Sequence, residues 1–139
     1  MTFDPSKQTA SKFFLGRYCR LQSNPARQVE REVLGDEVGL NGFTTIEEAR
    51  ALLDLLELTR GDRLLDVGAG RGWPGWLLAQ ASGCRLTSTD IPLTALAVAR
   101  QVFARRELAG RSEIVAADAV ELPFRPETFD AVTHADVFC

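Results

Sequence analysis

A glycine-rich segment beside an aspartate is the part of this chain whose residue types and spacing best fit chemistry. It reads LLDVGAGRGWPG over residues 64–75, so an apolar run ends at Asp66, passes through glycines and enters a helix led by Pro74. Glycines allow a ligand to approach the backbone closely, and a helix N-terminus presents free N–H groups to it. The ligand must therefore accept hydrogen bonds from N–H groups and tolerate the Asp66 carboxylate. A zwitterionic amino-acid group meets both requirements.

The elements that position this segment alternate between strand and helix patterns. A capping box at Thr45 and Glu48 begins a helix that extends to about Leu58. We expect strands at about 63–67, 85–89, 113–117 and 129–133, and helices at about 73–81 and 93–108. This alternation predicts an α/β fold with right-handed crossovers: a Rossmann-like, mostly parallel sheet with helices on both faces.

Three aspartates fall at or just beyond the carboxyl ends of the predicted strands: Asp66, Asp90 and Asp118. Ligands of open parallel sheets bind at this edge. Asp90 also has a simpler interpretation, as a cap of the helix that follows it. Asp118 has one as an ordinary turn residue. We expect the three carboxylates to gather at one edge of the sheet and to favour a cationic ligand there.

Two cofactor classes compete for the glycine loop. Residues 70–75 match the dinucleotide pattern G-x-G-x-x-G, with Asp90 at about the expected spacing. A pyrophosphate, however, is repelled by Asp66 and loses one N–H donor at Pro74. S-adenosylmethionine carries a sulfonium and an ammonium group, which nearby carboxylates favour. Asp90 can accept hydrogen bonds from both ribose hydroxyls of that cofactor.

Three motifs in order resemble the class I S-adenosylmethionine-dependent methyltransferases, in particular the ubiquinone/menaquinone-type small-molecule branch. They are LLDVGAGRGWPG at 64–75, LTSTDIP at 86–92 and ADAVELPFRPETFDAV at 117–132. The resemblance implies methyl transfer from S-adenosyl-L-methionine to a small-molecule acceptor. It assigns cofactor binding to Asp66, Gly68, Ala69, Gly70, Asp90, Ile91, Asp118, Ala119 and Thr133.

The resemblance also gives each part of the cofactor a set of residues. Gly68 and Gly70 line the methionine part, and Asp118, with the Ala119 backbone, reads adenine. Thr133 and His134 border the methyl group. His134 is the only histidine of the chain and the candidate catalytic base, although a purely structural role is the slightly favoured alternative.

The family's sheet has seven strands, whereas this chain ends shortly after its fourth. With the family's strand order, the fourth strand lies at an edge, which predicts self-association or completion by another chain. We interpret the chain as a fragment of a longer enzyme. Such a fragment is expected to retain cofactor binding more readily than catalytic turnover. Two other functions stay open: a non-catalytic S-adenosylmethionine-binding or interaction module, and a nicotinamide-dependent oxidoreductase.

The first 43 residues are polar and irregular in pattern, unlike the rest of the chain. We therefore divide the chain into an N-terminal helical extension at 1–43 and the cofactor-binding domain at 44–139. Ser23-Asn24-Pro25 predicts the start of a helix in the extension, with Val29, Val33 and Leu34 as its apolar face. The extension is expected to act as a lid, so that deleting residues before Phe43 weakens substrate binding.

Composition and charge limit which partners, metal sites and cellular locations are expected. The net charge is −3 and no stripe of Lys or Arg is visible, which argues against nucleic acid as a partner. No apolar run approaches the ~20 residues of a membrane span. Cys19, Cys84 and Cys139 are scattered, so we expect no disulfide framework, no metal site and a cytoplasmic location. The fold does not identify the methyl acceptor.

Overall fold

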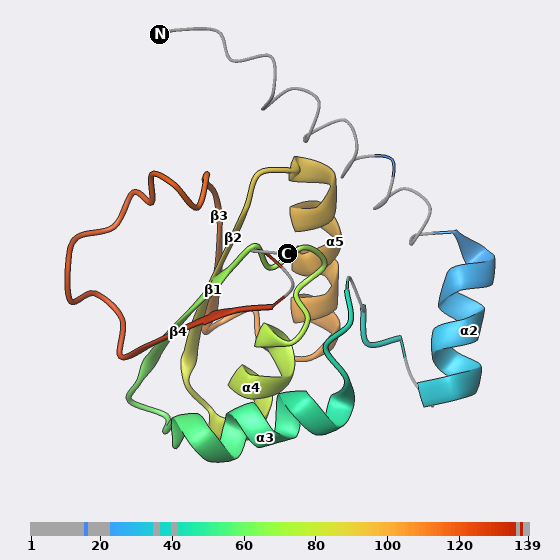
Figure 1. Cartoon of the computed structure of the whole chain (residues 1–139), viewed down its shortest axis with the longest axis horizontal. Coiled ribbons are helices and arrows are strands. Elements are labelled where there is room, and N and C mark those ends of the chain that lie inside the picture. The colour runs from blue at the N-terminus through green and yellow to red at the C-terminus, as the bar shows by residue number, and fades with distance from the viewer. Residues whose placement is uncertain (1–15, 17–22, 35–36, 40–41, 136, 138–139) are drawn as a thin grey trace, which may run out of the picture.

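The computed structural model describes residues 16, 23–34, 37–39, 42–135 and 137. Its helices are α2 (Asn24–Leu34), α3 (Ile46–Leu56), α4 (Gly75–Ser82) and α5 (Leu93–Arg105). Its strands are β1 (Arg63–Val67), β2 (Arg85–Asp90), β3 (Ser112–Ala116) and β4 (Ala131–His134). Each predicted strand and helix is confirmed to within a few residues at its ends (Figure 1).

The four strands form one parallel sheet in the order β3-β2-β1-β4, so the predicted α/β, Rossmann-like architecture is confirmed. Both βαβ crossovers run in the same direction along the sheet, and right-handed crossovers then place α4 and α5 on the same face. The predicted helices on both faces are therefore not found among the described residues, where α3, α4 and α5 share one core. Helix α3 packs against α4. The connection from β3 to β4 leaves the helices and arches away on the other side of the sheet (Figure 1).

Local sequence accounts for α3. The Thr45 hydroxyl accepts from the Glu48 N–H at 3.2 Å, and the Thr45 N–H donates to Glu48 Oε2 at 2.7 Å. This is the predicted capping box. The helix ends before Glu57, which has a left-handed φ of 48°. Ala49 is buried, and four further apolar residues of α3 pack on the core: Ile46, Leu52, Leu53 and Leu56.

The core lies between the sheet and the helices. Leu64 of β1, Leu86 of β2 and Leu78 of α4 are fully buried there. Val38 also belongs to this core, and its carbonyl accepts from Trp76 Nε1 at 2.8 Å. Residues 37–39 are thus packed against the Rossmann-like part, and the division at residue 43 stays a prediction.

The N-terminal helix differs from its prediction in the side chain that it buries. Val29 is 57% exposed, so its assignment to an apolar face is wrong, whereas the neighbouring Glu30 is only 8% exposed. The reason is an ion pair, described below, that draws Glu30 inward. None of the helices in the described ranges is long and apolar enough to cross a membrane.

Candidate functional site

The glycine loop joins β1 to α4 in a backbone conformation that needs glycine. Gly68, Gly70 and Gly72 have φ values of 69°, 53° and 99°, which side chains disfavour. The Ala69 N–H donates to the Thr89 carbonyl at 2.9 Å, which ties the loop to the end of β2. A methyl group at Gly68 would also overlap the side chain of Val137, which follows β4.

Alanine at Gly72 is expected to lower the free energy of unfolding by about 2–3 kcal/mol. Its Cβ would lie 2.6 Å from Phe103 Cε1, and the φ of 99° is strained for any L-residue. Urea denaturation measures the loss. Gly61→Ala is the matched control, because Gly61 has open space around its Cβ position and no positive φ. Equal stability of the two variants would contradict the loop packing described here.

Asp90 is fixed at the carboxyl end of β2, directly against the glycine loop. Its Oδ2 accepts from the Gly70 N–H and its Oδ1 from the Ile91 N–H, both at 2.7 Å. The N-cap residue of α5 is Pro92 and not Asp90, and the alternative in which the Asp90 side chain caps that helix stays a prediction. The Asp90 side chain is half-buried.

Asp66 lies deeper than the sequence suggests, with 1% of its surface exposed. Oδ1 accepts from the Thr133 hydroxyl at 3.1 Å, whereas Oδ2 is buried against the backbone of Gly75, whose amide makes no hydrogen bond of ordinary geometry with it. Oδ2 faces Gly75 at the start of α4, where an added Cβ would lie 2.5 Å from it. A buried carboxyl close to the ligand edge favours a positive group at that edge.

Burial raises the pKa of Asp66 to about 7, and the negative charge of Asp90 acts in the same direction. The Thr133 hydroxyl and the Gly75 amide oppose this rise in the pKa. A positive charge beside Asp66 would lower this pKa and favour the ionised carboxyl. Sequence reasoning treated Asp66 as a full charge, because burial cannot be seen in the motif.

The remaining predicted cofactor residues lie at the same edge of the sheet. Asp118 and Ala119 directly follow β3 and are half-buried, and Asp118 Oδ1 accepts from the Val120 N–H at 3.0 Å. Ile91 follows β2 and is 53% exposed. Thr133 of β4 stands opposite Asp66 in the register. The predicted gathering of the three aspartates at one edge is therefore confirmed as a placement.

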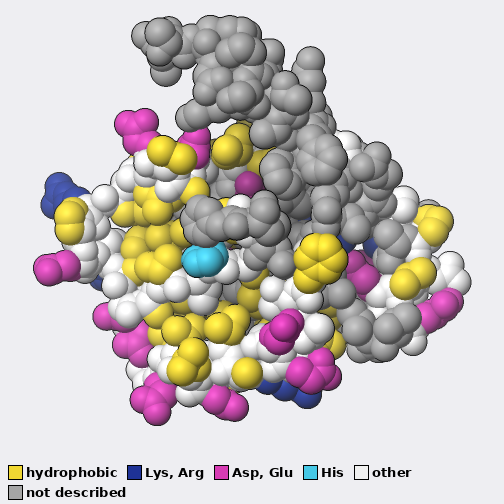
Figure 2. All heavy atoms as spheres, in the orientation of Figure 1, with side chains coloured by type: hydrophobic (Ala, Val, Ile, Leu, Met, Phe, Trp, Pro, Cys, Tyr) yellow, Lys and Arg dark blue, Asp and Glu magenta, His cyan; other side chains and the backbone are white. Residues whose placement is uncertain are grey.

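His134 stands apart from this buried group. It is exposed at the end of β4, opposite Val67, and lines a hollow of about 440 Å³ with Phe43, Leu52 and Leu55 among the other lining residues. Figure 2 shows hydrophobic side chains around the histidine on this face. The imidazole thus borders an apolar surface next to the candidate ligand edge, and its role as a base stays a prediction.

A buried ion pair behind the glycine loop was not predicted from the sequence. Arg71 Nη2 lies 2.6 Å from Glu30 Oε1, and the two side chains are 3% and 9% exposed. Glu30 Oε2 also accepts from the Gly39 N–H at 3.0 Å. The only sign of this pair in the sequence was the position of Arg71 inside the glycine loop, where a charged side chain is unusual. The pair attaches α2 and residues 37–39 to the loop.

Known proteins resemble this chain in both sequence and fold. A family model described as "Methyltransferase domain" matches residues 65–139. A demethylmenaquinone methyltransferase of Clavibacter sepedonicus is 45% identical over 75 residues, which are 52% of this chain and 28% of that protein. The chain thus spans less than a third of that curated relative.

Solved structures share the fold. A SAM-dependent methyltransferase from Thiobacillus denitrificans, in complex with S-adenosyl-L-homocysteine, has a TM-score of 0.59 and 25% identity. The match covers 66% of this chain and 37% of that one. An RNA methyltransferase from Salinibacter ruber has a TM-score of 0.56 at 23% identity, covering 58% of this chain and 53% of that one. Because the family model matches more than half of its residues, this chain belongs to the methyltransferase domain family.

Proposed function

We propose that this chain binds S-adenosyl-L-methionine at the carboxyl edge of its sheet and is the cofactor-binding part of a small-molecule methyltransferase. The observation that carries the proposal is the 2.7 Å bond from the Gly70 N–H to Asp90, which fixes that carboxylate at the carboxyl edge of the sheet, near the buried Asp66 carboxyl. This arrangement places carboxylates where a cation and hydroxyl groups of a ligand could be bound.

The residues at this edge fit the cofactor part by part. Gly68, Ala69 and Gly70 would line the methionine part. Asp90 would accept from the ribose hydroxyls, and the adenine would lie near Ile91, Asp118 and Ala119. When bound, the cofactor supplies a methyl group activated by the positive sulfur. Asp66 would stabilise the positive end of the cofactor through its charge, and Thr133 orients the Asp66 carboxyl.

The start of α4 argues against a nicotinamide dinucleotide. A pyrophosphate in a dinucleotide site sits at the helix N-terminus that follows the first strand. Here the buried Asp66 carboxyl lies against Gly75, the first residue of that helix. A dianion placed there would meet this acid and raise the pKa of Asp66 still further.

A small-molecule acceptor is supported by the similarity to a demethylmenaquinone methyltransferase. Our exclusion of nucleic acid is not supported, because an RNA methyltransferase shares the fold. Holding the acceptor and the methyl group in line lowers the activation barrier of methyl transfer by up to roughly 7–11 kcal/mol. A base is therefore needed only for weakly acidic acceptors. His134 is the residue we propose for that base, and a cytoplasmic location remains our expectation.

Calorimetry with S-adenosylhomocysteine and NAD tests the cofactor. We expect S-adenosylhomocysteine to bind and NAD not to bind. Asp90→Ala should weaken S-adenosylhomocysteine binding by about 10–100-fold, because hydrogen bonds to a charged group contribute about 1.5–3 kcal/mol. Asp54→Asn, an exposed change on α3, is the control and should leave the affinity unchanged. Tighter binding of NAD than of S-adenosylhomocysteine would favour the oxidoreductase alternative.

Turnover separates the enzyme from the non-catalytic module. Transfer of labelled methyl from S-adenosylmethionine to a quinol acceptor by this chain would exclude the binding-module alternative. Cofactor binding without transfer to any acceptor would favour it.

The exposed side of β4 predicts self-association. Within the described residues β4 pairs only with β1, and Val132 is 56% exposed. An unpaired strand edge is a template for another chain. Light scattering should show a mass that rises with concentration, and a stable monomer at high concentration would contradict this prediction.

A further inference from the structure

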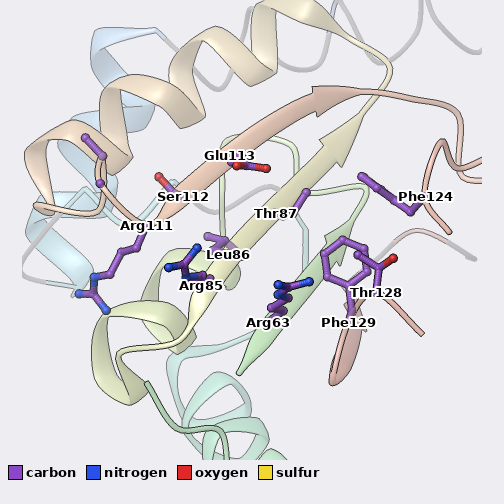
Figure 3. Close-up of a pocket in the computed structure, with 12 residues that line it drawn as sticks. Arg63, Arg85, Leu86, Thr87, Arg111, Ser112, Glu113, Phe124, Thr128 and Phe129 are labelled. Atoms are coloured by element: carbon purple, nitrogen blue, oxygen red, sulfur yellow. The ribbon is translucent and has the colours of Figure 1, made fainter. Parts of the chain in front are cut away.

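Arginines gather at the edge of the sheet opposite the candidate cofactor site. Arg63 begins β1 and Arg85 begins β2, and the two are direct partners in the parallel register. Neighbouring strands lie about 4.8 Å apart, so the two charges share one side of the sheet. Arg111 directly precedes β3 and lines the same hollow (Figure 3). In a chain of net charge −3, such a gathering of positive charge is unexpected.

The nearby carboxylates of Asp62 and Asp130 accept hydrogen bonds from other groups. Asp62 Oδ2 accepts from the Thr59 N–H and hydroxyl at 2.6 and 2.8 Å, and Asp130 Oδ2 accepts from the Arg63 backbone N–H at 2.8 Å. The guanidinium groups of Arg63 and Arg85 have no ion-pair partner among the described carboxylates. Like charges on directly opposed positions destabilise a sheet, and a bound anion would relieve that repulsion.

The hollow beside the arginines has the dimensions of a small-ligand pocket, at about 390 Å³. Phe124 and Phe129 form its apolar side, with their rings edge-to-face at 4.9 Å. Figure 3 shows these two rings beside Arg63, and Arg85 on the next strand. The Arg111 guanidinium turns toward the helix layer, because its Nη1 donates to the Ala79 carbonyl of α4 at 3.0 Å. Glu113 is the single carboxylate of the lining, so the charged lining residues sum to a positive charge.

We propose that this hollow is a binding site for an aromatic phosphate ester. The phosphate lies between Arg63 and Arg85, whose planar guanidinium groups match phosphate oxygens in pairs. The aromatic group of the ligand packs on Phe124 and Phe129. Because the site is at the amino ends of the strands, it is separate from the candidate cofactor edge and independent of the proposed function.

Titration of the whole chain with phenyl phosphate and with inorganic phosphate, followed by amide chemical shifts, tests the site. We expect saturable shifts around Arg63, Arg85 and Gly110, and phenyl phosphate should bind about fivefold or more tightly than inorganic phosphate because of the rings. The double variant Arg63→Gln/Arg85→Gln should lose about tenfold or more in affinity for both anions. Phe124→Leu should remove only the advantage of phenyl phosphate.

The matched control is Arg50→Gln/Arg105→Gln, which removes two exposed arginines from α3 and α5. It should leave both affinities unchanged. Equal losses in the two double variants would reduce the effect to net charge and overturn the proposal. Unsaturable shifts, or equal binding of the two anions, would also overturn it, as would displacement of phenyl phosphate by S-adenosylhomocysteine.

Discussion

Replacing Arg71 by methionine is expected to lower the free energy of unfolding by about 3–5 kcal/mol. The change leaves the Glu30 carboxyl buried behind the glycine loop without the guanidinium that lies 2.6 Å from it. Methionine has a similar length, so the loss comes from the uncompensated charge and not from a large cavity. Urea denaturation at neutral pH measures it.

Two variants make this result specific. Arg31 and Glu37 form an ion pair that is 52% and 26% exposed, so Arg31→Met should cost less than about 1 kcal/mol. Adding Glu30→Gln to Arg71→Met should restore much of the stability, because the amide oxygen still accepts from the Gly39 N–H while the buried charge is gone. If Arg71→Met were no more costly than Arg31→Met, the pair would not hold α2 against the loop.

Asp66→Asn is expected to stabilise the chain at pH 8 and to change its stability little near pH 4. Burial raises the pKa of Asp66 to about 7 in the folded state, from 3.8 for an unperturbed aspartate. The folded state therefore holds its proton more tightly, and the stability that this provides below pH 4 is lost as the pH rises through 7. The difference in pKa sets an upper bound of roughly 4 kcal/mol on that loss.

Free energies of unfolding measured from pH 4 to pH 8 for both proteins test this prediction. The wild-type curve should fall relative to the Asp66→Asn curve over this range, whereas the exposed Asp54→Asn control should follow the wild type. Parallel curves for wild type and Asp66→Asn would mean that Asp66 is not a buried acid. If the proposed function holds, a cationic ligand favours the ionised carboxyl. S-adenosylmethionine should then bind more tightly as the pH rises through 7, and only when Asp66 is present.

Asp66 illustrates which structural properties can be predicted from the sequence and which cannot. The motif correctly placed Asp66 at the carboxyl end of a strand, because apolar runs and glycine turns act over a few neighbouring residues. Whether the carboxyl faces the ligand or the helix layer depends on α4 folding back over β1, so that Gly75 meets Asp66. Its pKa, and with it the charge offered to a ligand, was therefore outside the reach of the motif.

What the sequence alone determined is local or follows from chain order: the capping box at Thr45, the alternation of strands and helices, and the edge at which Asp90 and Asp118 lie. Only the tertiary structure decided which charges are buried and paired. Glu30 and Arg71 are 41 residues apart, and Arg63 meets Arg85 only through the sheet register. Periodicity reports which face of one segment is apolar, whereas the partner of a charged side chain is set by how two distant segments pack.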